Sequence, residues 1–110
     1  MFYTIHYYSE AVQADILALP NTLRARYFNL ADRMEVSGPN LGEPHTKAFG
    51  GGLFELRLMA AEGIARVFFC TLVGRRIVML HSFVKKTDKT PPAERRIAEI
   101  RLKEVKNVDA

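Results

Sequence analysis

At Leu53 the hydrophobic pattern of the chain changes to a period of two, and this change sharply restricts the possible folds. Phe54, Leu56 and Leu58 alternate there with more polar residues, as along a strand with two unlike faces. Two turn-forming segments, 60–63 and 74–76, divide the following sequence into apolar runs. We therefore predict an antiparallel meander of three strands, over 53–59, 64–73 and 77–84.

The sequence before the meander has helical periodicity. A β-favouring run at 2–7 precedes Ser9, which can cap a helix that Pro20 ends. The apolar face of this helix is Val12, Ile16 and Leu19. A second helix, capped by Asn21 or Thr22, is expected to bury Leu23, Tyr27, Leu30 and Met34. The turn formers at 37–44 then lead the chain away from this helical hairpin.

Pro91 and Pro92 mark the start of a C-terminal helix, and we expect its buried side to carry Ala93, Ile97 and Ile100. Strand, helical hairpin, three-stranded antiparallel meander and C-terminal helix together predict a two-layer α+β fold. The helical hairpin should cover one sheet face, and polar residues should occupy the other face or its rim. A length of 110 residues fits a single domain, 1–110.

The positive charge is concentrated in the second half of the chain. Residues 1–46 hold three basic and five acidic residues, whereas residues 47–110 hold thirteen basic and seven acidic ones. Such a field favours a polyanionic partner, although a solvated surface explains the charge equally well. We predict a cytoplasmic protein without a membrane segment, because the sequence has neither a spanning apolar run nor a signal peptide. Cys70, the only cysteine, is expected to be a buried thiol.

Several kinds of site are disfavoured by the residues present. His6, His45 and His81 lie on separate segments without metal-ligand spacing, so we expect no metal and no cofactor. The glycines at 50–52 precede a strand and lack the ending of a phosphate-binding loop, which favours a simple turn.

Two arginines stand where a covered sheet would have apolar residues. If the turn is centred on Ala61 and Glu62, Arg57 lies directly opposite Arg66 on the neighbouring strand. Like charges in that position are destabilising, so the pair favours either an intervening carboxylate or an anionic ligand. Glu55 shares the face, and the spacing leaves a surface Glu–Arg network and an anion site equally possible.

Other cations and bases surround this pair. Lys85 and Lys86 follow the last strand and Lys47 precedes the glycines, while the charges of the terminal helix, Arg101 among them, are expected only to solubilise. Such a metal-free set suits phosphodiester chemistry, in which cations stabilise charge that builds up when a 2′-hydroxyl attacks phosphorus. Glu55, His45, His81 or a lysine could supply the acid and base. The structural alternative for His81 is a satisfied strand histidine, between Met79 and Phe83 on one apolar face.

Three strings of the sequence carry a family resemblance. They are Gly52-Leu53-Phe54-Glu55-Leu56-Arg57, then Arg66-Val67-Phe68-Phe69, then Leu80-His81-Ser82-Phe83-Val84-Lys85-Lys86-Thr87 with Thr90-Pro91. Together they resemble the phage-derived HigB-like branch of the RelE/ParE toxin superfamily. The resemblance implies a RelE-like fold, cleavage of mRNA on the translating ribosome by a metal-independent endoribonuclease, and a cognate antitoxin with a helix-turn-helix domain.

The resemblance also implies roles for individual residues. Arg57 matches a strand cation used on the RNA backbone, Arg66 the transition-state arginine, and Lys85 or Lys86 the cation after the last strand. Glu55 stands where some relatives have a second lysine, and could serve as the base. We expect contacts to RNA from Lys47, Lys86, Phe83 and His81.

One departure from the family concerns an aromatic residue near the C-terminus, whose ring the relatives stack on an RNA base. Here every tyrosine precedes residue 28, so Phe83, Phe69 or Phe49 would have to replace it. Two other functions stay open: a ParE-like toxin that inhibits DNA gyrase without catalysis, and a basic RNA-binding accessory protein.

Overall fold

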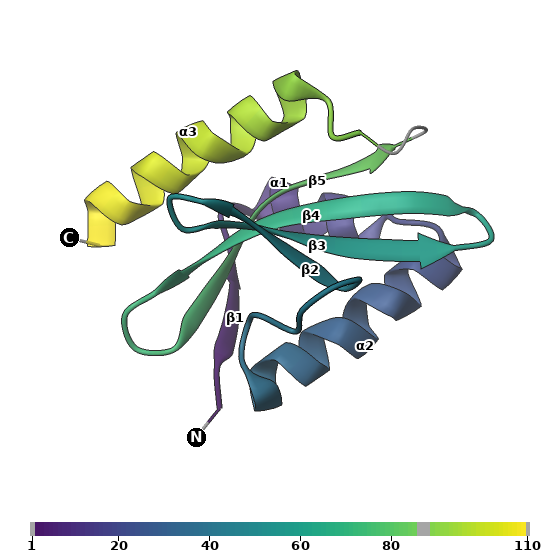
Figure 1. The fold of residues 1–110 in the computed structure, drawn as a ribbon, viewed down its shortest axis with the longest axis horizontal. Helices are drawn as coiled ribbons and strands as arrows, with labels where there is room; N and C mark the ends of the chain where they lie inside the picture. Colours follow the sequence, from purple (N-terminus) through teal and green to yellow (C-terminus); the bar gives the residue numbers. More distant parts are fainter. Residues whose placement is uncertain (1, 86–88, 110) are drawn as a thin grey trace.

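The computed structural model describes residues 2–85 and 89–109 and shows one five-stranded sheet with helices on both faces (Figure 1). The elements in chain order are β1 (Thr4–Tyr7), α1 (Glu10–Leu17), α2 (Asn21–Ser37), β2 (Thr46–Gly50), β3 (Leu53–Ala60), β4 (Gly63–Leu72), β5 (Arg76–Lys85) and α3 (Pro92–Asp109). The sheet order is β1-β5-β4-β3-β2, with β1 parallel to β5 and the other pairs antiparallel. The predicted α+β class is confirmed, and the predicted elements occur in the expected order, with one further strand, β2, before the meander.

Strand β2 was not predicted. It is a short edge strand whose residues are mostly exposed or half-buried, so it has no apolar period to reveal it. The turn at Gly51 and Gly52, both with positive φ, joins β2 to β3. The expected turn before Leu53 is therefore the tip of a hairpin.

Helices α1 and α2 cover one face of the sheet, as predicted. The Ser9 hydroxyl accepts a hydrogen bond of 3.2 Å from the Val12 amide and caps α1. The predicted cap of α2 is wrong, since Pro20 holds the capping position and makes no side-chain bond there. Instead, Glu62 in the β3–β4 turn accepts from the Thr22 amide at 3.0 Å, and this contact ties the start of α2 to the sheet.

Helix α3 lies across part of the opposite face (Figure 1). Its fully buried residue is Ala98, and Leu102 and Val105 pack beside it against Phe68 and Leu80. The predicted buried side of this helix is wrong for two residues.

Those two residues are Ala93, which is exposed, and Ile100, which has 54% of its surface exposed. Polar groups on the sheet-facing side explain the error. Glu94 bonds to His81, and Arg101 donates to the Leu80 carbonyl at 2.8 Å. The helix is therefore rotated relative to its apolar spacing.

Candidate functional site

Beside the N-terminal end of α3, the sheet face under that helix carries polar residues. The strand register places them in two adjacent rows, because paired residues on neighbouring strands share a face. One row is Lys47, Glu55, Phe68 and His81, and the next contains Arg57, Arg66 and Phe83. Lys85 follows in a third row, opposite Ile64. The face thus collects residues from β2, β3, β4 and β5.

Arg57 and Arg66 are directly opposite each other, as predicted. Glu55 Oε1 lies 3.4 Å from Arg57 Nε and 3.5 Å from Arg66 Nη1. We call these three residues the arginine–glutamate cluster. One carboxylate faces two guanidinium groups, so the three side chains together carry a positive charge.

The cluster is buried to different depths. The exposed fraction of the side chain is 1% for Glu55, 6% for Arg66 and 20% for Arg57. The network is therefore not the surface one that spacing allowed, because its carboxylate and one arginine lie in the interior, where partnerless charges are costly. Arg57 is the member that reaches the surface.

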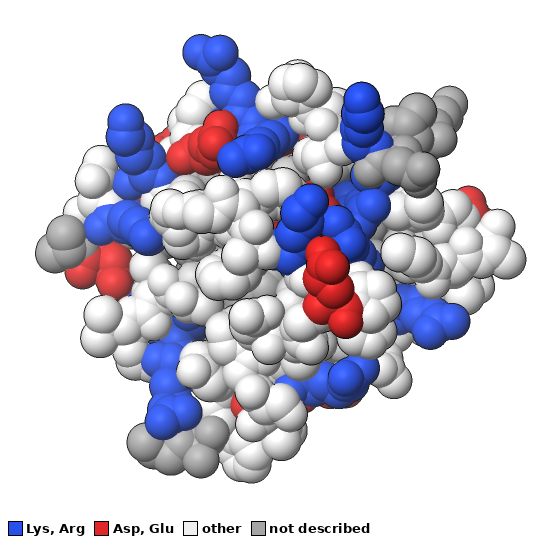
Figure 2. All heavy atoms as spheres, in the orientation of Figure 1, with Lys and Arg blue, Asp and Glu red and all other residues white. Residues whose placement is uncertain are grey.

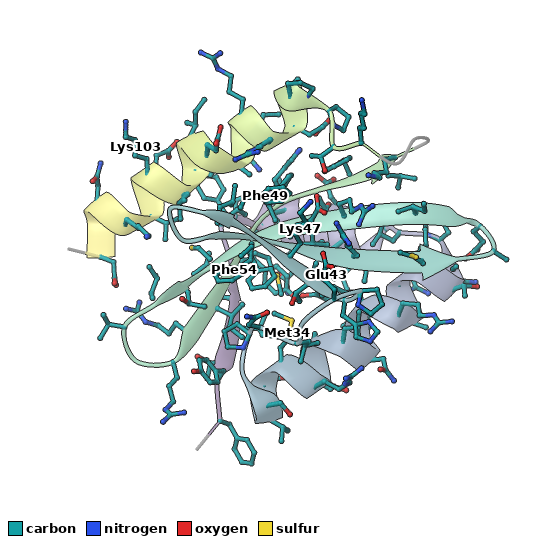
Figure 3. All side chains as sticks on the ribbon, viewed as in Figure 1. Met34, Glu43, Lys47, Phe49, Phe54 and Lys103 are labelled. Carbon is teal, nitrogen blue, oxygen red and sulfur yellow. The ribbon has the colours of Figure 1, made fainter. Side chains whose placement is uncertain are left out.

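Further contacts hold the cluster in position. The Thr90 hydroxyl, just before α3, donates to Glu55 Oε2 at 2.8 Å, so both oxygens of this carboxylate are engaged. Arg57 Nη1 also lies 3.6 Å from Oε1 of Glu43, whose side chain is 69% exposed. Figure 2 shows Lys and Arg side chains gathered near the middle of the side of the molecule drawn there, between α3 and α2, with an acidic side chain against them, and Figure 3 labels Glu43 and Lys47 beside the same place.

His81 lies diagonally across from Arg66 on the neighbouring strand. Its Nε2 atom is 2.5 Å from Glu94 Oε2 on the first turn of α3, and its ring stacks on Phe83. This contact agrees with the structural alternative for His81, a histidine satisfied within the fold. Its predicted neighbour Met79 is on the other face, because a bulge in the β4–β5 register shifts the pairing at Leu80.

The lysines differ in exposure. Lys47 is exposed, with its Nζ 5.6 Å from the centre of the Phe49 ring. Lys85, at the end of β5, is buried, with 5% of its surface exposed. Lys86 lies outside the described residues.

The three predicted stacking rings are separated by the fold. Phe69 is fully buried against the α1–α2 side, so its candidacy is wrong. Phe83 and Phe49 are half-buried on the α3 side. Of the candidates, these two rings are near enough to the surface to meet a base.

Sequence reasoning missed Glu94, and misread Arg101 as solubilising. Arg101 binds the Leu80 carbonyl and lies 4.8 Å from the Tyr8 ring centre, so it is a structural contact. The sequence carries one signal for Glu94, because it is the acidic residue in the first turn of α3, where negative charge favours the helix. Its partner on β5 was not visible without the tertiary fold.

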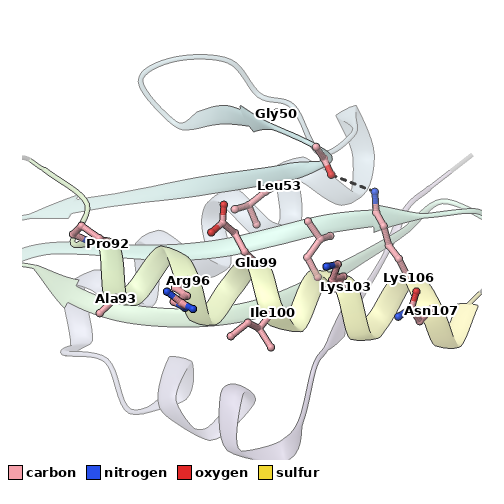
Figure 4. A pocket seen from close by; sticks show the side chains of 12 residues that line it. Gly50, Leu53, Pro92, Ala93, Arg96, Glu99, Ile100, Lys103, Lys106 and Asn107 are labelled. Atoms are coloured by element: carbon pink, nitrogen blue, oxygen red, sulfur yellow. Dashed lines mark hydrogen bonds between the residues drawn. The ribbon is translucent and has the colours of Figure 1, made fainter.

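A separate groove of about 1000 Å³ runs between α3 and the β2–β3 turn (Figure 4). Apolar residues line it, including Leu53, Ala93 and Ile100, and Arg96, Lys103 and Lys106 add positive charge. Lys106 donates to the Gly51 carbonyl at 3.4 Å and bridges the two walls. The groove contains no member of the arginine–glutamate cluster.

Within residues 2–85 and 89–109, no three His, Cys, Asp or Glu side chains are grouped so that they could hold a metal ion. In the same part of the chain, no helix is long and apolar enough to cross a membrane.

No curated protein matches the chain. The family model described as phage-derived protein Gp49-like (DUF891) matches residues 14–103, which include the second half of α1, all of α2, the meander and most of α3. The chain therefore belongs to the phage-derived Gp49-like family, which is related to the RelE and HigB toxins.

Proposed function

We propose that this chain is the toxin of a type II toxin–antitoxin pair and cleaves mRNA on the translating ribosome, in the cytoplasm. The observation that carries the proposal is the pair of arginines held face to face by one buried carboxylate. Family membership supports it, since the relatives named above are toxins.

The chemistry we propose is attack of a ribose 2′-hydroxyl on the adjacent phosphorus. A base removes the 2′ proton, the new O2′–P bond forms, and the P–O5′ bond breaks as an acid protonates the 5′ oxygen. The products are a 2′,3′-cyclic phosphate and a 5′-hydroxyl end. Arg57, which reaches the surface, would contact the phosphate, and Arg66 beneath it would stabilise the charge that develops on its oxygens.

We assign Glu55 to positioning. Both of its oxygens are already engaged, by two arginines and by Thr90, and the side chain is 1% exposed. A general base must reach the proton that it removes, and Glu55 is poorly placed for this. Its role would be to fix the angle of the two guanidinium groups.

His81 and Glu94 are the proton-transfer groups that the arrangement favours. The ring is partly exposed, lies diagonal to Arg66 and is oriented by the Glu94 carboxylate. A histidine fixed by a carboxylate is a common way to present an imidazole to a substrate. Phe83, which is half-buried, and the exposed Lys47 would line the path of the RNA around it.

A cognate helix-turn-helix antitoxin is the proposed protein partner, and the groove beside α3 is the surface that suits it. The groove combines the exposed Ile100 with Arg96, Lys103 and Lys106, so it suits an acidic amphipathic segment. Ile100→Asp should abolish rescue by the co-expressed antitoxin and leave growth arrest unchanged. Val108→Asp, at a residue 88% exposed outside the groove, is the matched control; normal rescue of the Ile100 variant would contradict this assignment.

Primer extension on cellular mRNA after brief induction tests the proposed function. Ribosome-phased cuts are expected with the wild-type chain and with Lys103→Ala, which lies well away from the cluster on α3 (Figure 3). Arg66→Lys should give no cuts, because a point charge does not replace a planar guanidinium. DNA damage without cuts would favour gyrase inhibition instead, and neither effect would favour plain RNA binding.

A further inference from the structure

The sheet edge beside α2 opens a second polar pocket. Strand β2 begins at Thr46, opposite Leu56, so in the described part of the chain residues 58–60 at the end of β3 have no paired strand on that side and form the edge of the sheet themselves. A pocket of about 150 Å³ lies there, between this edge and α2. It is lined by Arg26, Asn29, Leu30, Arg33, Pro44, His45, Arg57 and Met59.

Two arginines of α2 line this pocket and give it positive charge. Arg26 and Arg33 are seven residues apart, about two helical turns or 10 Å along one face. Both are exposed, and neither forms an ion pair or a hydrogen bond with another residue in the described part of the chain. Their charges are therefore available to a ligand.

Arg57 connects this pocket to the arginine–glutamate cluster. It lines the pocket, and its backbone amide donates to the His45 carbonyl at 2.8 Å, which fixes the histidine at the pocket wall. Arginine side chains thus continue from the cluster, around the β3 edge, onto α2, and the exposed Glu43 lies against Arg57 between them. Figure 2 shows Lys and Arg side chains over α2 as well as in the central group.

We propose that Arg26, Arg33 and His45 form a second phosphate-binding subsite, which holds the backbone of the RNA strand beyond the cluster. This inference rests on the proposed function. The volume suits a phosphate group and is below the roughly 300 Å³ of pockets that enclose a nucleotide-sized ligand.

The chemistry of the lining predicts how this subsite reads RNA. It offers guanidinium groups, an imidazole and the Asn29 amide, and within the described part of the chain no Phe, Tyr or Trp ring lines it. Contacts of this kind position a nucleic acid without reading its bases. The subsite should therefore increase affinity for any RNA sequence.

Binding of non-cleavable RNA tests the subsite. The probes are fluorescent 2′-O-methyl oligoribonucleotides of 4 and 12 nucleotides, measured by anisotropy across a salt series. Arg26→Gln/Arg33→Gln should weaken binding of the 12-mer about tenfold and lower its salt slope by about 1.4, or 0.7 per lost phosphate contact. The 4-mer, which the cluster alone can hold, should bind with unchanged affinity.

Arg24→Gln is the matched control. It removes one arginine charge from the same helix, as each half of the double variant does, but Arg24 does not line the pocket and instead bonds to the Leu17 carbonyl and to Asn21. It should leave 12-mer binding unchanged. Circular dichroism checks that all variants are folded.

Four results would overturn the subsite. Two concern the variants: an unchanged 12-mer affinity in the double variant, or an equal loss of 12-mer affinity in Arg24→Gln. The other two are no binding of either RNA by the wild type at 50 mM salt, and a double variant that loses affinity for a glutamate-rich peptide but not for RNA. The probes cannot be cleaved, so the subsite and the nuclease fail separately. A wild type that binds as expected and does not cut mRNA would retain the subsite and refute the proposed function.

Discussion

Glu55 is surrounded by more partners than any other carboxylate of the site. Its two oxygens meet Arg57, Arg66 and Thr90, and 1% of its side chain is exposed. Two like charges opposite each other on a sheet are unfavourable without it. The residue therefore links the stability of the sheet to the geometry proposed for phosphate binding.

Glu55→Gln tests that link, since it retains the shape and removes the charge. The free energy of unfolding, measured by urea denaturation, should fall by about 2–3 kcal/mol, because the buried Arg66 and the partly exposed Arg57 lose their counter-charge. Glu43→Gln removes the exposed partner of Arg57 and should cause no measurable change. Equal stabilities of Glu55→Gln and the wild type would show that the cluster is not an interdependent unit.

The reactivity of Cys70 tests whether α3 stays packed on the sheet. Cys70 is fully buried under α3, and burial raises the pKa of its thiol to about 11. The reactive thiolate is therefore scarce as well as inaccessible at pH 8. A thiol reagent such as DTNB should label the folded protein hardly at all at pH 8, and completely in denaturant; rapid labelling of the folded chain would mean that α3 leaves the sheet.

Among the elements, α3 is attached to the sheet by polar contacts as much as by apolar packing. Thr90 just before it, Glu94 in its first turn and Arg101 further along each bind a group on β3 or β5. These contacts place the start of the helix over the site. They also explain why apolar spacing alone predicted the wrong buried face.

Removing the Glu94–His81 contact should impair cleavage more than binding. His81→Ala is expected to lower the cleavage rate at least 100-fold and Glu94→Gln about tenfold, with a changed pH dependence of the rate, because proton transfer contributes about 10²–10⁴ in rate. Affinity for non-cleavable RNA should be retained. Glu99→Gln, on the same helix and 52% exposed, is the control; wild-type rates in both site variants would exclude this pair from the chemistry.

For the whole molecule, the features that follow from local rules were predictable. The turn at 61 and 62 determines the register that places Arg57 opposite Arg66, and Ser9 caps α1 as its type and position indicate. The missed features depend on contacts between distant segments. Glu62 replaces a local cap on α2, and the bulge at Leu80 moves Met79 to the other face.

The site divides in the same way. Glu55 as the partner of both arginines follows from strand alternation, whereas Glu94, Thr90 and the α2 arginines reach their places only through packing of helices on the sheet. The net charge of residues 1–46 gave no sign of the subsite on α2. That net charge is negative, although Arg26 and Arg33 share one face of the helix. Net charge describes a segment, and a binding surface depends on where the charges lie.

The most direct test is mRNA cleavage in a purified translation system, with the chemistry of the new ends determined. The wild-type chain should cut ribosome-bound mRNA and leave 2′,3′-cyclic phosphate and 5′-hydroxyl ends, without added metal beyond what the ribosomes need. Arg57→Ala and Arg66→Lys, shown to be folded, should cut at least 100-fold more slowly, with Lys103→Ala unchanged. Full cleavage by folded Arg57→Ala and Arg66→Lys, or the absence of any cleavage by the wild type, would contradict the role of the two arginines.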